Sequence, residues 1–366
     1  MNNSKISPSQ MQLLMVMYIF GFAVVTLPQN LAAANGKHGW VSLLLTSFLA
    51  CLSVIAISFV AQKSGKHRFP EFMNSIVGKP LGKLICLLFT ARLLLLAATR
   101  LNVFGITMNE FMLPYTPKWL VLLIFILTCI YAAMKKFETQ ARLAEILIVF
   151  MAIPVIYIIL MSLRSAELTN FLPLYNIEIE PTVNAAFSSF SAFSGIELLF
   201  LIIPYVCLKK GTNITRRAFF TTLTIGLLVT ISFASVIAVF GETTTVINSF
   251  QFLRMMDAAQ IPGLFFTRQG ALIMCFWIIS AFAAISAEIF FASLLLKQVI
   301  NLGKRRWYIF FCAAVAFGLV LAQNHNTVNS ALQLINGYAG FTFMLALPLV
   351  LFLLYPLWRE KANENS

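Results

Sequence analysis

The chain has little charge for its length. Of its 366 residues, 11% are Asp, Glu, Lys or Arg, and 60% are hydrophobic. Soluble globular domains carry about 25% charged residues on average, so this composition excludes a large water-soluble domain. Acidic residues are especially scarce, with 13 Asp and Glu against 26 Lys and Arg, and the formal net charge is +13.

The sequence also lacks the motifs of common enzyme and metal sites. It contains no GxxxxGK[ST] phosphate-binding loop, no HExxH zinc motif and no GxSxG nucleophile motif. Its three histidines do not cluster, and its six cysteines all lie in apolar segments, which is typical of small buried side chains and not of a disulfide framework or a metal site. We therefore predict that the chain is not an enzyme and has no resident cofactor or metal. The residues concerned are His38, His67 and His325, and Cys51, Cys86, Cys129, Cys207, Cys275 and Cys312.

Long apolar runs are what the sequence has instead. Runs of about 20 residues, the length that a helix needs to cross roughly 30 Å of hydrocarbon, recur along the whole chain. This pattern predicts an all-α polytopic membrane protein that forms a single transmembrane domain over residues 1–366. An alternative for the first run is a signal peptide, with Lys5 before it and LAAAN after it, although the run is longer than such signals usually are. The ten expected spans are 10–33, 38–62, 83–112, 119–134, 140–163, 183–208, 215–240, 269–297, 306–323 and 329–357.

The distribution of Lys and Arg sets the expected orientation. With the N-terminus in the cytoplasm and ten spans, most of the 26 basic residues fall in cytoplasmic segments, as the positive-inside rule requires. Both termini are then cytoplasmic. This topology also explains the positive net charge, so no nucleic-acid partner is expected, while the basic loops can contact anionic lipid. The basic residues on the opposite side are Lys37, Lys118, Arg164, Arg254 and Arg268.

Two of the spans are interrupted by Gly and Pro. The first, MYIFGFAVVTLPQN, has Gly21 near its middle and Pro28 further along. The sixth, SSFSAFSGIELLFLIIPY, has Gly195 at a similar depth and Pro204 further along. One such span is typical of a kink or of close helix packing, but two at the start of two five-span halves indicate inverted repeats in which both helices are discontinuous. The halves cover about 10–163 and 183–357.

Broken helices in mid-membrane expose backbone groups that can bind a ligand. Freed amides at the start of a half-helix attract an anionic group, and freed carbonyls attract a cation or an ammonium. Together they suit an amino-acid zwitterion. Phe residues near the second break indicate an apolar or small side-chain pocket, although any one of the 35 Phe could be an ordinary packing residue. The expected ligand-binding residues are Gly21, Phe22, Ala23, Val24 and Thr26 on the first span, and Phe193, Ser194, Gly195 and Glu197 on the sixth.

Four ionisable residues stand out at bilayer depth inside predicted spans, where an unpaired charge costs roughly 2.5–3.5 kcal/mol. Arg92 and Arg100 are about 80° apart around the third span, and Glu197 and Glu288 lie on the sixth and the eighth. We expect these residues to form a network of two ion pairs, Arg100–Glu197 and Arg92–Glu288. As an alternative to a permanent pair, the Glu197 carboxylate could contact the ligand or carry a coupled proton.

Several segments of the chain resemble one protein family. They are ISPSQ (6–10) followed by GFAVVTLP, FMLPYTPKWL (111–120), FETQARLAEIL (137–147), NFLPLYN (170–176), FSSFSAFSGIELLFLIIPYV (187–206) and IPGLFFTRQGALIMCFWIISAF (261–282). In their order and spacing the chain is similar to the spore germination permeases. These are the B subunits of endospore germinant receptors and relatives of the amino acid–polyamine–organocation transporters. The resemblance covers nearly the whole chain.

The resemblance implies a LeuT-like fold of 5+5 inverted repeats in the inner membrane of a dormant spore. It also implies a nutrient-sensing role together with a membrane-embedded A subunit and a lipoprotein C subunit. An ion- or proton-coupled amino-acid permease is the alternative function, and a membrane scaffold with an inactive pocket is a third. A coupled sodium ion is left open, since Ser280 and Ser286 offer hydroxyls on the eighth span. The stretch 241–268 is either a lid over the outer vestibule or a helix on the membrane surface.

Overall fold

The computed structural model describes residues 5–63, 69–173, 175, 177–207, 212–258, 269–323 and 326–353. Within these ranges the regular elements are helices, together with one isolated β-bridge between Ile6 and Val206. Some predictions lie outside the described residues. They concern the cytoplasmic position of both chain ends, the residues His67, Arg268 and His325, and the last part of the stretch 241–268.

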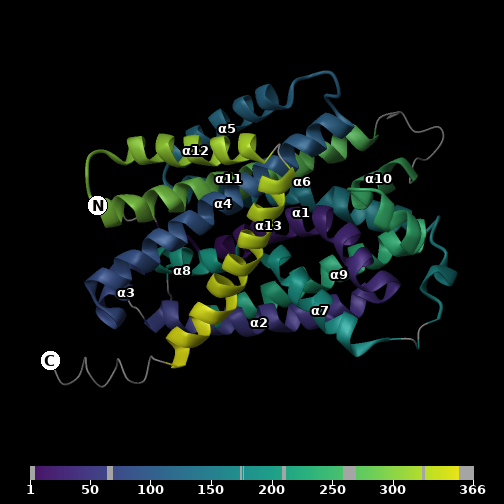
Figure 1. The fold of residues 1–366 in the computed structure, drawn as a ribbon, viewed down its shortest axis with the longest axis horizontal. Helices are drawn as coiled ribbons and strands as arrows, with labels where there is room; N and C mark the ends of the chain where they lie inside the picture. Colours follow the sequence, from purple (N-terminus) through teal and green to yellow (C-terminus); the bar gives the residue numbers. More distant parts are fainter. Residues whose placement is uncertain are drawn as a thin grey trace.

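The apolar runs form helices with short connections, and Figure 1 shows their arrangement. The α-helices are α1 (Pro8–Asn35), α2 (Gly39–Lys63), α3 (Phe69–Val77), α4 (Lys79–Phe111), α5 (Lys118–Met134), α6 (Phe137–Ser162), α7 (Ile179–Ser189), α8 (Leu199–Ile202), α9 (Ile214–Ile247), α10 (Gln251–Ala258), α11 (Gln269–Ile300), α12 (Arg305–Ala322) and α13 (Asn326–Phe341). Short 3₁₀ turns cover Gly36–His38, Leu168–Phe171, Phe190–Phe193, Ile196–Leu198 and Ile203–Tyr205, and a π-helical turn, Thr342–Ala346, follows α13.

The helices have the length and composition of a polytopic membrane protein. Seven helical segments among the described residues are long and apolar enough to cross a membrane, and a bent pair adds an eighth. The number of ten spans stays a prediction, because it requires Pro8–Lys63 to contain two spans and the 17-residue α5 to be another. The other segments are Lys79–Phe111, Phe137–Ser162, Ile214–Ile247, Trp277–Ile300, Arg305–Ala322 and Ala331–Leu353, and the bent pair is Ile179–Phe193 with Ile196–Tyr205.

The first span is a continuous α-helix, so the prediction that it is discontinuous was wrong. α1 passes through both Gly21 and Pro28 without a break. Gly21 instead marks a close approach between α1 and α11, because a Cβ at this position would lie 2.7 Å from Cβ of Ser280. Ser280 Oγ donates a hydrogen bond to the Met17 carbonyl at 2.7 Å, and Trp277 Nε1 donates to the Gly21 carbonyl at 2.9 Å. The glycine therefore serves helix packing, which is the common role of small residues in membrane helices.

The sixth predicted span is broken at Gly195, as its sequence indicates. α7 continues into the 3₁₀ turn that ends at Phe193, and a second short helical piece begins at Ile196. The two pieces are bent by 47° relative to each other. Gly195 has φ +115°, in the region that a residue with a Cβ adopts only with strain. We refer to the Ser194–Gly195 peptide unit as the break.

α1 lies in the interior of the helical assembly. It packs against α9, α11, α6 and α7 and against the 3₁₀ turn before the break. In Figure 1, α5 and α12 run along one edge of the molecule and α2 along the opposite edge, with α1 and α4 between them. α13 runs obliquely across the front of this view. The break is therefore surrounded by helices and not by solvent or lipid.

The beginning of α1 is tied to the end of the broken span by main-chain hydrogen bonds. Ile6 N donates to the Tyr205 carbonyl at 2.9 Å, and Cys207 N donates to the Ile6 carbonyl at 2.9 Å. Directly after Ile6, a capping box starts α1: Gln10 N donates to Ser7 Oγ, and Ser7 N donates to Gln10 Oε1. These bonds fix the relative position of α1 and the broken span at this end.

Candidate functional site

Two arginines from α4 meet the break from one side. Arg100 Nη2 donates to the Ser194 carbonyl at 2.5 Å, and Arg92 Nη2 donates to Ser194 Oγ at 2.8 Å. Carbonyls freed at the break were predicted to attract a cation. In this structure the cation is a side chain of the protein itself, because the guanidinium of Arg100 donates a hydrogen bond to the carbonyl of Ser194.

The N–H group of the same peptide unit is also hydrogen-bonded to a side chain. Glu197 Oε2 accepts a hydrogen bond from Gly195 N at 2.7 Å. A carboxylate that folds back onto an amide in this way satisfies a donor that the helix cannot. Both polar groups of the break, the carbonyl of Ser194 and the N–H of Gly195, are thus held by charged side chains.

The same side chains form two ion pairs. Arg92 Nη2 lies 3.3 Å from Glu197 Oε1, and Arg100 Nη1 lies 2.5 Å from Glu288 Oε1. The four predicted residues do form a network, but the predicted partners are exchanged. Eight residues separate Arg92 and Arg100, which is about 12 Å along a helix, so the relative heights of α4, α11 and the broken span decide the partners. Sequence alone does not contain those heights.

The network is almost completely removed from solvent. The side chains of Arg92 and Arg100 are 1% and 5% exposed, and those of both glutamates are 0% exposed. Two positive and two negative charges compensate one another, which is the condition for keeping charges at this depth. Even so, three polar atoms of the network have no hydrogen-bond partner, namely Arg92 Nε, Glu197 Oε1 and Glu288 Oε2, and neither does Oη of the buried Tyr18 on α1. The network therefore retains unused hydrogen-bonding capacity.

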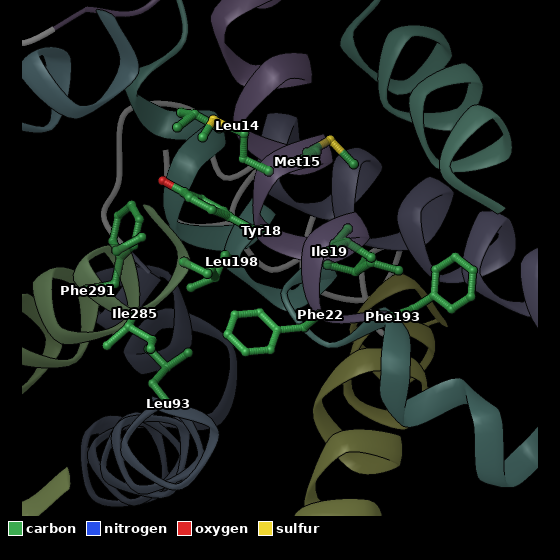
Figure 2. Packing of buried hydrophobic residues seen from close by; sticks show 14 of the residues in the cluster. Leu14, Met15, Tyr18, Ile19, Phe22, Leu93, Phe193, Leu198, Ile285 and Phe291 are labelled. Carbon is green, nitrogen blue, oxygen red and sulfur yellow. The ribbon is translucent and has the colours of Figure 1, made fainter. Parts of the chain in front are cut away.

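One face of α1 completes the site. The Phe22 ring lies over Arg100, with 5.0 Å between the guanidinium carbon and the ring centroid, in the geometry of a cation–π interaction. Figure 2 shows Tyr18 and Phe22 on the side of α1 that faces Leu198, Ile285 and Phe291, and Ile19 on the side toward Phe193. Tyr18 interacts electrostatically with Glu288 and Arg100. Sequence analysis missed Tyr18, although a tyrosine in the middle of an apolar span is a polar signal.

Other predicted ligand-binding residues of α1 lie elsewhere. Gly21 and Val24 border a small cavity of about 30 Å³ between α1, α6, α10 and α11, which has room for about one or two water molecules. Thr26 Oγ1 donates to the Phe22 carbonyl at 2.8 Å within its own helix. Ala23 is fully buried. Their part in binding a ligand stays a prediction.

The residues predicted on the sixth span lie at the break. Ser194, Gly195 and Glu197 carry the contacts described above, and Phe193 is a fully buried ring immediately before them. The structure thus gathers the four network residues, these residues of the sixth span and Phe22 into one site.

The two predicted serines of the eighth span both donate their hydroxyl protons to carbonyls, which leaves their oxygen lone pairs available as acceptors. Ser280 Oγ donates to the Met17 carbonyl, and Ser286 Oγ donates to the Ala283 carbonyl at 3.1 Å. In the part of the chain that the structure describes, no group of three or more His, Cys, Asp or Glu side chains is placed to hold a metal ion. A coupled sodium ion or proton stays a prediction.

The stretch predicted as a lid or surface helix contains α10, which borders the cavity. Phe252 and Leu253 of α10 line it, and Arg254 of the same helix forms an ion pair with Glu110 at the end of α4. α10 therefore covers the cavity next to Gly21.

Comparison with known proteins identifies the family. The family model described as "Spore germination protein" matches residues 5–328, which include the break and its ion pairs. The chain belongs to this spore germination protein family. It is 26% identical over 362 residues to Spore germination protein YndE of Bacillus subtilis (strain 168), which covers 99% of each chain.

Further members of the family from Bacillus subtilis (strain 168) match to a similar extent. Spore germination protein A2 is 23% identical over 348 residues, or 93% of each chain. Spore germination protein KB is 23% identical over 377 residues, or 100% of this chain and 98% of that one. The names of these relatives refer to germination and not to a catalysed reaction. The chain is therefore a membrane protein of the spore germination family, in agreement with the resemblance seen in the sequence.

Proposed function

We propose that this chain is the nutrient-sensing membrane subunit of a spore germination receptor, and that it binds a small zwitterion, such as an amino acid, at the break. One observation carries the proposal. The carbonyl of Ser194 and the amide of Gly195 are held by a guanidinium and a carboxylate, which are the chemical counterparts of the two ends of an amino acid.

Binding would exchange internal partners for external ones. The ligand's carboxylate would take the place of Glu197 at the Gly195 amide. Arg100 would stay on the Ser194 carbonyl, because the C=O and N–H of one trans peptide unit point in opposite directions and one α-amino acid cannot reach both. The ligand's ammonium would bind a carboxylate oxygen of the network that has no hydrogen-bond partner, and Glu197 would keep Arg92 as its ion-pair partner. No net charge is added at this depth, so the main electrostatic cost of binding in the membrane is avoided.

This exchange gives the ligand a way to act on conformation. A ligand shifts an equilibrium only if it binds one state better than the other. A ligand carboxylate on the Gly195 amide would bind only the state in which Glu197 has moved away. The free energy of binding is thereby linked to a rearrangement of buried charges.

The proposal extends to the setting of the protein. We place it in the spore inner membrane, with ten spans in a 5+5 plan and with A and lipoprotein C subunits as partners. The family resemblance and the distribution of Lys and Arg support this setting. The proposed site does not require a break in α1, since the broken span supplies the backbone amide.

A ligand screen on the purified chain tests the proposal. In lipid nanodiscs, at least one of the twenty amino acids is expected to raise the melting temperature. At a concentration 100-fold above its Kd, a single bound ligand stabilises by about 2.7 kcal/mol. The amino alcohol and the carboxylic acid that correspond to that amino acid each carry one of the two charged ends, and neither should stabilise the protein to this extent.

Two outcomes would contradict the proposal. If no amino acid stabilises the protein, the site does not bind this class of ligand. If labelled amino acid accumulates with turnover in proteoliposomes, the chain is a permease and not a sensor. Saturable binding without uptake is the expected result.

Substitution of Glu197 by Gln tests the exchange of partners. The variant keeps a side-chain oxygen beside Gly195 but lacks the charge that competes with the ligand carboxylate. The Kd for the stabilising amino acid is therefore expected to fall about tenfold, which corresponds to 1.4 kcal/mol. Glu138→Gln is the matched control, because Glu138 forms an exposed pair with Arg142 on α6, and its Kd should not change. An unchanged Kd in Glu197→Gln would leave Glu197 with a packing role only.

A further inference from the structure

α13 and the turn that follows it present one row of residues to the break. Asn336, Gly340 and Met344 follow one another at intervals of four residues, so they lie on one side of the helix. Asn336 Oδ1 accepts a hydrogen bond from Arg92 Nη1. A Cβ on Gly340 would lie 3.2 Å from Arg92 Nη2, so the glycine makes room for the guanidinium. Met344 Sδ is 3.6 Å from Ser194 Oγ.

Arg92 is therefore shared between α13 and the broken span. One of its terminal nitrogens contacts Asn336, while the other contacts Ser194 Oγ and Glu197 Oε1. A guanidinium is planar and holds its donors in a fixed fork. When one nitrogen changes partner, the other must move as well. A change at the break is thus transmitted mechanically to Asn336.

The structure of α13 suits a helix that responds to such a change. This row of residues continues into the π-helical turn Thr342–Ala346, and π turns inside helices are frequent at functional sites. Its outer side is open, since Tyr338 is 75% exposed and Leu334 is 63% exposed. The helix therefore contacts the break on one side and the surroundings of the molecule on the other.

We propose that Asn336 is a positioning residue for the break, and that α13 is the helix through which a change at the break reaches the surface of the molecule. This inference deepens the proposed function, because it names the element that carries the signal outward. Asn336 does not contact the ligand site directly and acts through Arg92. It lies beyond the segment matched by the family model.

A spin label on α13 tests this coupling without any ligand. All labelled variants carry Cys207→Ser in the full chain, because Cys207 is the exposed cysteine among those described as free thiols. Labelling of the Cys207→Ser protein alone measures the contribution of the remaining thiols. A nitroxide is attached at Tyr338→Cys. The change at the break is Ser194→Ala, which removes a hydrogen-bond acceptor of Arg92. The ratio of mobile to immobile components in the spectrum is expected to change about two-fold or more.

Three controls separate coupling from a general disturbance. The same label at Tyr131→Cys on α5, where Tyr131 is 64% exposed, should not respond to Ser194→Ala. Adding Asn336→Ala should abolish the response at position 338, and Asn336→Asp, which keeps the oxygen acceptor, should restore it. If Ser194→Ala does not fold, Glu197→Gln replaces it, because that change also releases Arg92.

The inference is overturned if the label at position 338 does not respond, or if it responds equally with Asn336→Ala. Because no ligand is present, this result is independent of the proposed function. If the label at position 338 does not respond although amino acids still stabilise the protein, only the coupling is disproved. If the label responds although no amino acid stabilises the protein, only the proposed ligand is disproved.

Discussion

Replacing Arg100 by Met is expected to cost about 3–5 kcal/mol of stability, the usual penalty for removing one partner of a buried ion pair. Arg100 holds Glu288 at 2.5 Å and the Ser194 carbonyl at 2.5 Å. Its loss leaves a fully buried carboxylate without its partner and an unsatisfied carbonyl at the break. Since proteins are stable by only about 5–15 kcal/mol, this loss is a large part of the total stability. Reversible unfolding in mixed micelles, followed by Trp fluorescence, measures the loss.

Two further variants make this prediction specific. Arg142→Met removes an arginine from an ion pair on the surface of α6, where the Arg142 side chain is 70% exposed, and should change stability by less than about 1 kcal/mol. Arg100→Met with Glu288→Met leaves no unpaired charge and should be more stable than Arg100→Met alone. If Arg100→Met and Arg142→Met destabilise equally, the buried network does not hold the break in place.

Replacing Gly21 by Ala is expected to destabilise the protein by about 1–3 kcal/mol, the range for forcing a methyl group into a packed interior. The new Cβ would lie 2.7 Å from Cβ of Ser280 on α11, so the two helices would have to separate. Their separation would also lengthen the hydrogen bonds from Trp277 and Ser280 to the backbone of α1. Thermal unfolding of the purified chain measures the effect.

A second substitution is expected to restore part of the stability that Gly21→Ala removes. Ser280→Gly removes the atoms that clash, so Gly21→Ala with Ser280→Gly should be more stable than Gly21→Ala alone. Gly195→Ala provides the contrast, because its Cβ would find its nearest neighbours at 3.5 Å but φ is +115°. Its cost comes from backbone strain and should not be relieved by Ser280→Gly. A rescue of both glycine variants would argue against the contact between α1 and α11.

The two glycines explain why only one of the predicted breaks was correct. Gly21 and Gly195 lie at similar places in their spans, and each is followed by a proline, so the sequence patterns are nearly the same. What differs is the partner that each meets in space. Gly21 meets the serine of a neighbouring helix, whereas at Gly195 the freed backbone groups are satisfied by one arginine, Arg100, and one glutamate, Glu197. A break requires such partners, and they come from residues distant in sequence.

The ion pairs also show which features the sequence could predict and which it could not. The cost of isolated charges in a membrane was enough to predict that Arg92, Arg100, Glu197 and Glu288 form a network. The pattern of residues within α4 could not predict which arginine meets which glutamate. Asn336 was missed for a related reason, since its partner Arg92 had already been assigned to a carboxylate. Membrane-spanning class, by contrast, follows from composition and run length and needed no tertiary information.

The main-chain pairing of Ile6 with Tyr205 and Cys207 has a consequence for how the molecule can move. Each such bond contributes about 0.5–1.5 kcal/mol, and the capping box at Ser7 holds the adjoining turn. α1 and the broken span can therefore tilt against each other about this joint, with the largest displacement at their far ends. A route for solute past the joint would require main-chain bonds to open in every cycle. The architecture therefore favours movements that leave this end of α1 and the broken span joined.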